Sequence, residues 1–129
     1  MDIGIVEYGV KLTQVFEDIV SKELIQARFK KKKALDIFDV LAFARKFSDL
    51  DQVVIIAELI RDEKEKNEAF YDGLADLEAD TGKNIFKAIY YDDEEGEPVV
   101  KELGETFINY LYHPEKLEKK EEGGEGFEF

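Results

Sequence analysis

Apolar residues recur three or four positions apart in almost every segment of this chain, which is the spacing of a helix and not of a strand. Residues 1–10 are the exception, because they contain Gly4, Gly9 and several β-branched side chains that also suit a short strand. The first helical stretch has its apolar face at Ile5, Tyr8, Leu12, Val15, Phe16 and Ile19. This periodicity predicts an all-α fold, with a short N-terminal strand as an open alternative.

Residues 34–47 form the most apolar of these stretches. Two apolar stripes together cover more than half of the expected helix circumference, which is typical of a central helix or of one at an interface. Asp49 followed by Gln52 resembles a capping box, so we expect a further helix with Val53, Ile56 and Ile60 facing inward.

Three more helices are expected before the chain changes character. Asn67 is a plausible cap for a helix with Phe70, Leu74 and Leu77 on one face. A short helix is expected over residues 85–90, and Pro98 suits the first turn of a last one. Residues 1–113 are thus predicted to form one compact domain of five to six helices.

The composition changes from Pro114 onward. Residues 115–129 contain six Glu, three Lys and three Gly, with little apolar content before Phe127 and Phe129. Such a segment cannot bury enough apolar surface to order itself, so we expect residues 114–129 to be a mobile acidic tail. The two Phe make this tail a candidate for docking into a pocket of a partner.

The charge balance restricts the choice of partners. The chain has 18 Lys+Arg and 31 Asp+Glu, a net charge of −13, which repels phosphate backbones and anionic membrane surfaces. No run approaches the ~18 apolar residues of a membrane span. We therefore expect a cytoplasmic protein that binds neither membranes nor nucleic acid.

The residues needed for most metal and redox chemistry are scarce. The chain has no Cys and one His, His113, which excludes thiolate zinc sites and cysteine nucleophiles. The acidic loop 92–97 does not have the register of an EF-hand. No catalytic residue, metal site or cofactor is nominated, and we expect a protein that is not an enzyme.

One acidic ridge is expected on the fourth helix. Its four carboxylates follow one another at four-residue intervals, a spacing that opposes helix formation by ~0.2 to 0.5 kcal/mol per like-charged pair. The ridge is a solvated face, a docking surface for basic side chains, or a mimic of a phosphate backbone. It consists of Glu68, Asp72, Asp76 and Asp80.

The single basic concentration lies at Arg28 and residues 30–33. Cations are favoured at the C-terminal end of a helix, which explains this run without any ligand. The alternative is self-association, because a basic patch on one copy can pair with an acidic region on another.

In overall character the chain resembles the small tail assembly chaperones of long-tailed bacteriophages. The resemblance is based on an acidic helical domain, an over-rich apolar helix over residues 34–47 and a charged Gly/Lys/Glu tail. It implies a non-enzymatic protein of the host cytoplasm that self-associates and shields a hydrophobic helix of the tape measure protein. The expected partner-binding residues are Ile37, Phe38, Val40, Leu41, Phe47, Phe127 and Phe129.

Two other functions remain open. An inhibitor that mimics nucleic acid would bind a basic DNA-binding protein through the acidic ridge. An enzyme would need at least two Asp or Glu buried in a pocket, where their pKa values could be tuned for acid–base work.

Overall fold

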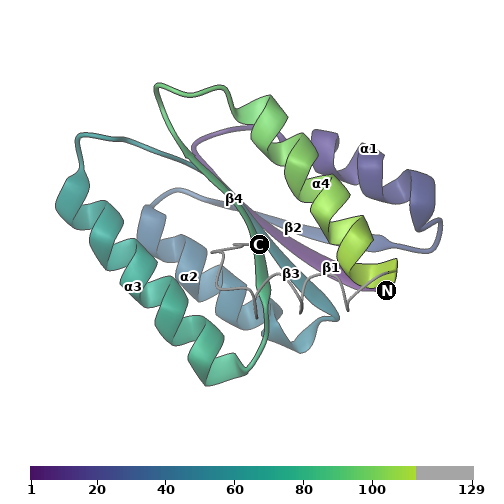
Figure 1. Cartoon of the computed structure of the whole chain (residues 1–129). Coiled ribbons are helices and arrows are strands. Elements are labelled where there is room, and N and C mark those ends of the chain that lie inside the picture. Colours follow the sequence, from purple (N-terminus) through teal and green to yellow (C-terminus); the bar gives the residue numbers. More distant parts are fainter. Residues whose placement is uncertain (113–129) are drawn as a thin grey trace, which may run out of the picture.

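Four parallel strands form the centre of the protein, seen here in a computed structural model that describes residues 1–112. The strand order in the sheet is β2-β1-β3-β4, so β1 and β3 are the inner strands and β2 and β4 form the edges (Figure 1). The strands are β1 (Asp2–Tyr8), β2 (Arg28–Ala34), β3 (Gln52–Leu59) and β4 (Ile85–Tyr91).

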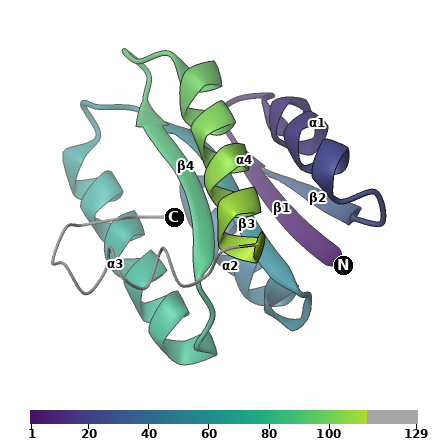
Figure 2. The same ribbon diagram turned by 45° about the vertical axis from the view of Figure 1, so that its right-hand side comes forward.

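Helices cover both faces of this sheet. Helices α1 and α4 lie on one face, and α2 and α3 lie on the other (Figures 1 and 2). A short 3₁₀ helix, η1 (Phe47–Asp49), follows α2 and leads into β3. The helices are α1 (Thr13–Glu23), α2 (Ile37–Lys46), α3 (Lys64–Thr81) and α4 (Gly96–Tyr112).

The inner strands are buried on both faces. In β3 the five residues from Val53 to Ala57 are all buried, with Val54 and Ile56 packed in the α1/α4 core and the others in the α2/α3 core. A strand covered on both sides reads as a continuous apolar run, because neither face alternates with polar residues. The sheet thereby separates the apolar interior into two cores.

The prediction of an all-α fold is wrong, and the doubly buried strands explain why. The residues expected to form helices over 53–60 and 85–90 are β3 and β4, and the basic run is β2 and not a helix end. In a continuous apolar run, residues at spacings of three and four are apolar by necessity, so helical matches arise without a helix. The alternative of a short strand near the N-terminus is the one that the structure adopts, as β1.

Several predicted helices are present with different boundaries. Helices α2, α3 and α4 lie where residues 34–47, the stretch around Phe70 and the stretch after Pro98 were expected to be helical. The capping residue of α2 is Asp36, whose Oδ1 accepts a hydrogen bond of 2.8 Å from the backbone N–H of Phe38. The predicted tail, residues 114–129, lies outside the described residues.

Within residues 1–112, no helix combines the length and the apolar character that crossing a bilayer requires.

Candidate functional site

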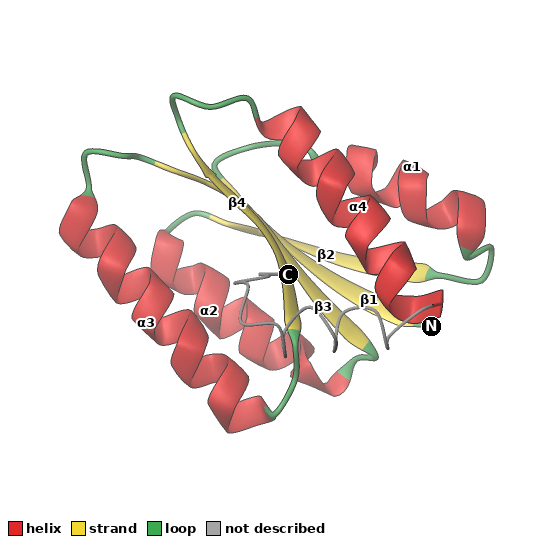
Figure 3. Cartoon of the chain, in the orientation of Figure 1, coloured by secondary structure: helices red, strands yellow, loops and turns green. Residues whose placement is uncertain are grey.

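The loops that follow the parallel strands gather at one end of the sheet (Figure 3). At this end β1 leads into α1 on one face, whereas its neighbour β3 leads into α3 on the other face. The two chain segments diverge there and leave a crevice outside the carboxyl ends of the strands. Open α/β sheets bind their ligands at this kind of switch point.

Three neighbouring strands, β1, β3 and β4, each have a polar residue near the carboxyl end on the same face. On the α1/α4 face, Ile3 and Ile5 of β1 are followed by Glu7, and the corresponding last positions of β3 and β4 are Glu58 and Tyr90. Glu58 and Tyr90 are direct partners in the β3–β4 register, whereas Glu7 is paired with Ile56, two residues before Glu58. The apolar core of this face is therefore closed by a polar row at the carboxyl end of the sheet.

Glu7 holds the start of α1. Its side chain is buried, with the residue 8% exposed, and its Oε2 accepts hydrogen bonds from the backbone N–H groups of Leu12 at 2.9 Å and Thr13 at 3.3 Å. Free amides at a helix N-terminus bind a carboxylate well, because the helix dipole adds to the hydrogen bonds. This carboxylate thus fixes the direction in which the chain leaves β1.

Tyr90 presents an unsatisfied hydroxyl. The residue is 3% exposed, and no hydrogen-bond partner of its Oη is present among the described residues. Burial raises the pKa of Tyr90 to about 12, with smaller contributions from the carboxylates of Glu58 and Glu7. The side chain is consequently a neutral phenol at physiological pH, able both to donate and to accept a hydrogen bond.

A pocket of about 480 Å³ opens beside this hydroxyl. Three carboxylates and one ammonium group line it, and the ammonium of Lys101 lies 3.6 Å from the carboxylate of Glu97. The volume is in the range of sites for small molecules. Its lining residues are Val10, Leu12, Glu58, Tyr90, Glu95, Gly96, Glu97, Pro98 and Lys101.

A second unsatisfied buried atom lies at the same end of the sheet. Asn67, in the first turns of α3, is 5% exposed, and its Oδ1 has no partner among residues 1–112. Its Nδ2 donates a hydrogen bond of 2.9 Å to the carbonyl of Ile60, just beyond β3. Buried polar atoms without partners are rare in folded proteins, so the presence of two at the carboxyl end of this sheet favours a binding site there.

Arg61 connects two of the loops at this end of the sheet. Its guanidinium donates hydrogen bonds of 2.7 and 2.9 Å to the carboxylate of Asp93, and it stacks 4.1 Å from the ring centroid of Tyr91. Its backbone N–H also donates to Oδ1 of Asp92 at 3.1 Å. The hydrogen bonds from Arg61 hold the pKa of Asp93 below its ordinary value. The β3–α3 and β4–α4 loops are therefore linked.

The predicted partner-binding residues do not form one surface. Ile37 and Val40 are buried, Leu41 packs against Gly73, and Phe47 packs against Gly4. Phe38 is the exposed member of the five that lie in the described part of the chain, and it follows the exposed Leu35. Phe127 and Phe129 lie outside that part. The over-rich apolar character of residues 34–47 is thus mostly explained by packing on the sheet.

The acidic ridge lies on the exposed face of α3. All four of its residues are exposed, and Asp80 forms an ion pair of 3.3 Å with Arg45 of α2. The ridge is separate from the pocket, which draws its carboxylates from β3 and from the start of α4. Its proposed mimicry of nucleic acid stays a prediction. Within residues 1–112, no group of three acidic, His or Cys side chains is arranged to hold a metal ion.

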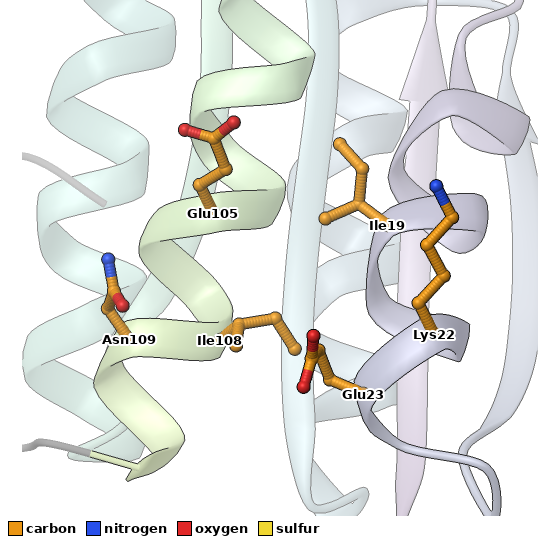
Figure 4. A pocket seen from close by; sticks show the side chains of 6 residues that line it. All are labelled: Ile19, Lys22, Glu23, Glu105, Ile108 and Asn109. Carbon is orange, nitrogen blue, oxygen red and sulfur yellow. The ribbon is translucent and has the colours of Figure 1, made fainter.

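A second hollow of about 370 Å³ lies between α1 and α4. Ile19, Lys22 and Glu23 come from α1 (Figure 4). On α4, Ile108 points toward Glu23, whereas Glu105 and Asn109 point away from α1. The polar groups do not converge, so this groove is a poorer candidate than the pocket at the strand ends.

The polar row could not be found before the strands were known. Tyr90 reads as an inward residue of a short helix, and Glu7 and Glu58 are two among 31 acids. The useful signal lies in every second residue of each strand. On one face of the sheet, two apolar residues are followed by a polar one at the carboxyl end of the strand. That signal has meaning only once residues 53–59 and 85–91 are assigned as strands.

No known protein family matches this sequence, and no curated protein matches it either.

Proposed function

We propose that this protein is a ligand-binding α/β domain that holds a positively charged amine in the pocket at the carboxyl ends of β1, β3 and β4. The main support is the buried hydroxyl of Tyr90, which has no hydrogen-bond partner among residues 1–112, and Tyr90 is the register partner of Glu58. An unmade hydrogen bond at a buried hydroxyl costs about 1 to 3 kcal/mol, which a bound ligand would recover.

The charges of the lining favour a cation. Glu58, Glu95 and Glu97 outnumber Lys101, so the pocket attracts positive groups and repels anions. An ammonium group has three donors and no acceptor, which matches a carboxylate and a phenol oxygen. Val10, Leu12 and Pro98 provide apolar surface for the alkyl part of such a ligand.

The experiment is a titration of ¹⁵N-labelled protein with 1,4-diaminobutane, followed by NMR. We expect chemical-shift changes at Glu58, Tyr90 and Gly96, and none with 1,4-butanediol, which has the same length without the charge. Glu58→Gln should weaken binding about tenfold, the equivalent of about 1.4 kcal/mol. Glu105→Gln, in the α1/α4 groove, removes the same charge elsewhere and should leave the affinity unchanged.

Equal shifts with the diol, or equal affinities for the two Gln variants, would contradict the proposed site. No reaction is proposed for this pocket, and the prediction of a protein that is not an enzyme stands as a prediction.

A second candidate function is the binding of a hydrophobic helix, as the resemblance to tail assembly chaperones implies. It is favoured by Leu35, which is 86% exposed, and Phe38, which is 44% exposed, at the start of α2. Exposed apolar neighbours of this kind are typical of interaction sites. Light scattering with an amphipathic helical peptide tests it: Phe38→Ser should reduce complex formation, whereas Tyr71→Ser on α3 should not. A protein that stays monomeric and binds no such peptide would exclude this function.

A further inference from the structure

Strand β2 has a free edge. It pairs with β1 on one side, and no strand of residues 1–112 pairs with its other side. An unpaired edge presents a row of backbone donors and acceptors, which can hydrogen-bond to another extended segment. The edge is seven residues long, about 23 Å at the rise of a strand.

This edge is strongly basic. Arg28 pairs with Asp2 at 2.9 Å and Lys31 pairs with Glu17 at 3.2 Å. Lys30 and Lys33 are exposed and form no ion pair within the described part of the chain, and Lys32 lies 5.9 Å from the ring centroid of Phe43. Three cations on one short strand thus have no carboxylate partner among residues 1–112.

Apolar surface continues from the end of this strand. Leu35 follows β2 directly, and Phe38 lies in the first turn of α2. Both side chains are exposed although their neighbours Ile37 and Val40 are buried. The free edge therefore presents a basic strip that ends in an apolar patch.

We propose that residues 121–129 of the same chain dock along the free edge of β2, in the same direction as the strand, with Phe127 and Phe129 at Leu35 and Phe38. This segment contains four Glu, no Lys and no Arg, and its two Phe lie at its end. Its charge complements the unpaired lysines, and its aromatic residues complement the apolar patch. In an extended segment, residues 127 and 129 point to the same face and Glu128 points to the other.

The described structure places the end of α4 close to the start of β2. Helix α4 ends at Tyr112, whose Oη donates a hydrogen bond of 3.1 Å to the carbonyl of Glu23. Glu23 is the last residue of α1, and β2 begins five residues later at Arg28. Residues 113–120 can extend about 27 Å and residues 121–129 about 30 Å, which exceeds the length of β2. The direction from Tyr112 past Arg28 to Leu35 requires a parallel pairing.

A single spin label tests this docking. The chain has no Cys, so Gly126→Cys gives one attachment site for a nitroxide. We expect the amide signals of residues 30–35 and of Phe38 to be broadened relative to a diamagnetic label at the same position. Added salt should reduce the broadening, because the paired charges are at the surface.

A matched pair of variants separates docking from a general charge effect. Glu125→Gln with Glu128→Gln should reduce the broadening at least about twofold, whereas Glu115→Gln with Glu118→Gln removes the same charge outside the segment and should leave it unchanged. Broadening spread evenly over the surface, or absent from β2, overturns the proposal. In a mixture of ¹⁵N-labelled chains without nitroxide and unlabelled chains with it, broadening of β2 would assign the segment to a second copy and overturn docking within one chain.

Discussion

The Cα of Gly96 lies directly against the phenol ring of Tyr90, so closely that a Cβ on residue 96 would overlap Cζ and Oη of the ring. This contact explains how the hydroxyl becomes buried without a hydrogen bond to any of the residues that the structure describes. The first residue of α4 covers the phenol with backbone, and only glycine leaves room for it. The pocket opens at this junction, where Gly96 and Tyr90 both line the wall.

We expect Gly96→Ala to displace the ring of Tyr90. The added methyl group would force either the phenol or the first turn of α4 to move, so the free energy of unfolding should fall by about 1 to 3 kcal/mol. Binding of 1,4-diaminobutane should weaken as well, since the hydroxyl leaves its position. Urea unfolding measures the first effect and NMR titration the second.

The control for this change is Glu102→Ala, which introduces the same alanine at an exposed position of α4 outside the pocket and should leave both stability and binding unchanged. An alanine at 96 that leaves both stability and binding unchanged would mean that the phenol is not held in this place.

Replacement of Tyr90 by Phe tests whether the buried hydroxyl lowers the free energy of unfolding. At neutral pH the variant removes a buried polar group that has no partner in the described part of the chain, so we expect stability equal to that of the natural chain or higher by about 1 kcal/mol. A lower stability would indicate that the hydroxyl has a hydrogen-bond partner in solution. Urea unfolding of the two proteins side by side provides the measurement.

Alkaline pH should affect the two proteins differently. Because the folded pKa of Tyr90 is raised from 10.0 to about 12, the folded state keeps the proton between these values while the unfolded state loses it. Raising the pH through this window therefore favours unfolding, and the contribution of Tyr90 should fall by about 2 to 3 kcal/mol. Tyr90→Phe lacks this contribution, so the difference between the two pH profiles isolates it.

Glu7→Ala should destabilise the start of α1. The variant removes the acceptor for the amides of Leu12 and Thr13, so we expect the free energy of unfolding to fall by about 1 to 2 kcal/mol. Glu7→Gln keeps an oxygen in place without the charge and should lose less. Hydrogen exchange at the amides of residues 12 and 13 should accelerate in the Ala variant. Unchanged exchange there would show that the carboxylate does not hold these amides in solution.

The sequence was informative about α2, α3 and α4, where one face meets the sheet and the other meets water. The helical spacing of Phe70, Leu74 and Leu77 is real, because these residues pack in the α2/α3 core. The search for helical periodicity failed on β3, because Val53 to Ala57 are buried on both faces of the sheet and no polar residue interrupts the apolar run. Periodicity reports one-sided burial, so it cannot separate a doubly buried strand from a helix.

The candidate site was less predictable than the fold. Glu7, Glu58 and Tyr90 are separated by 51 and 32 positions in the chain, and the pairing of β1, β3 and β4 brings them to the same end of one face of the sheet. Whether a carboxylate such as Glu58 faces the proposed site depends on this long-range pairing and on burial. Neither the pairing nor the burial can be predicted from the local sequence around Glu58.

Arg61→Gln should remove the hydrogen bonds that the guanidinium of Arg61 donates to the carboxylate of Asp93. The side-chain hydrogen bonds from Arg61 are the largest cause of the low pKa of Asp93, so this pKa should return toward its ordinary value. Because the pKa of Asp93 is lower in the folded state, this group stabilises the fold when the pH is above its ordinary pKa. That contribution is lost as the pH falls through the folded-state pKa. Carboxyl ¹³C NMR during an acid titration measures the change. Arg45→Gln, which frees Asp80 instead, should leave the titration of Asp93 as it was.

Phe47, which the sequence analysis predicts to bind a partner, packs on the sheet against Gly4 of β1. A Cβ on Gly4 of β1 would lie 2.5 Å from Cγ of Phe47 and 2.6 Å from its Cδ2. Gly4→Ala should therefore lower the free energy of unfolding by about 1 to 3 kcal/mol. In a Phe47→Ala background the same change meets no ring and should cost about 1 kcal/mol less, because contacting residues couple. Equal costs of Gly4→Ala in the two backgrounds would mean that Phe47 leaves the sheet in solution, and the residue would again be available to a partner.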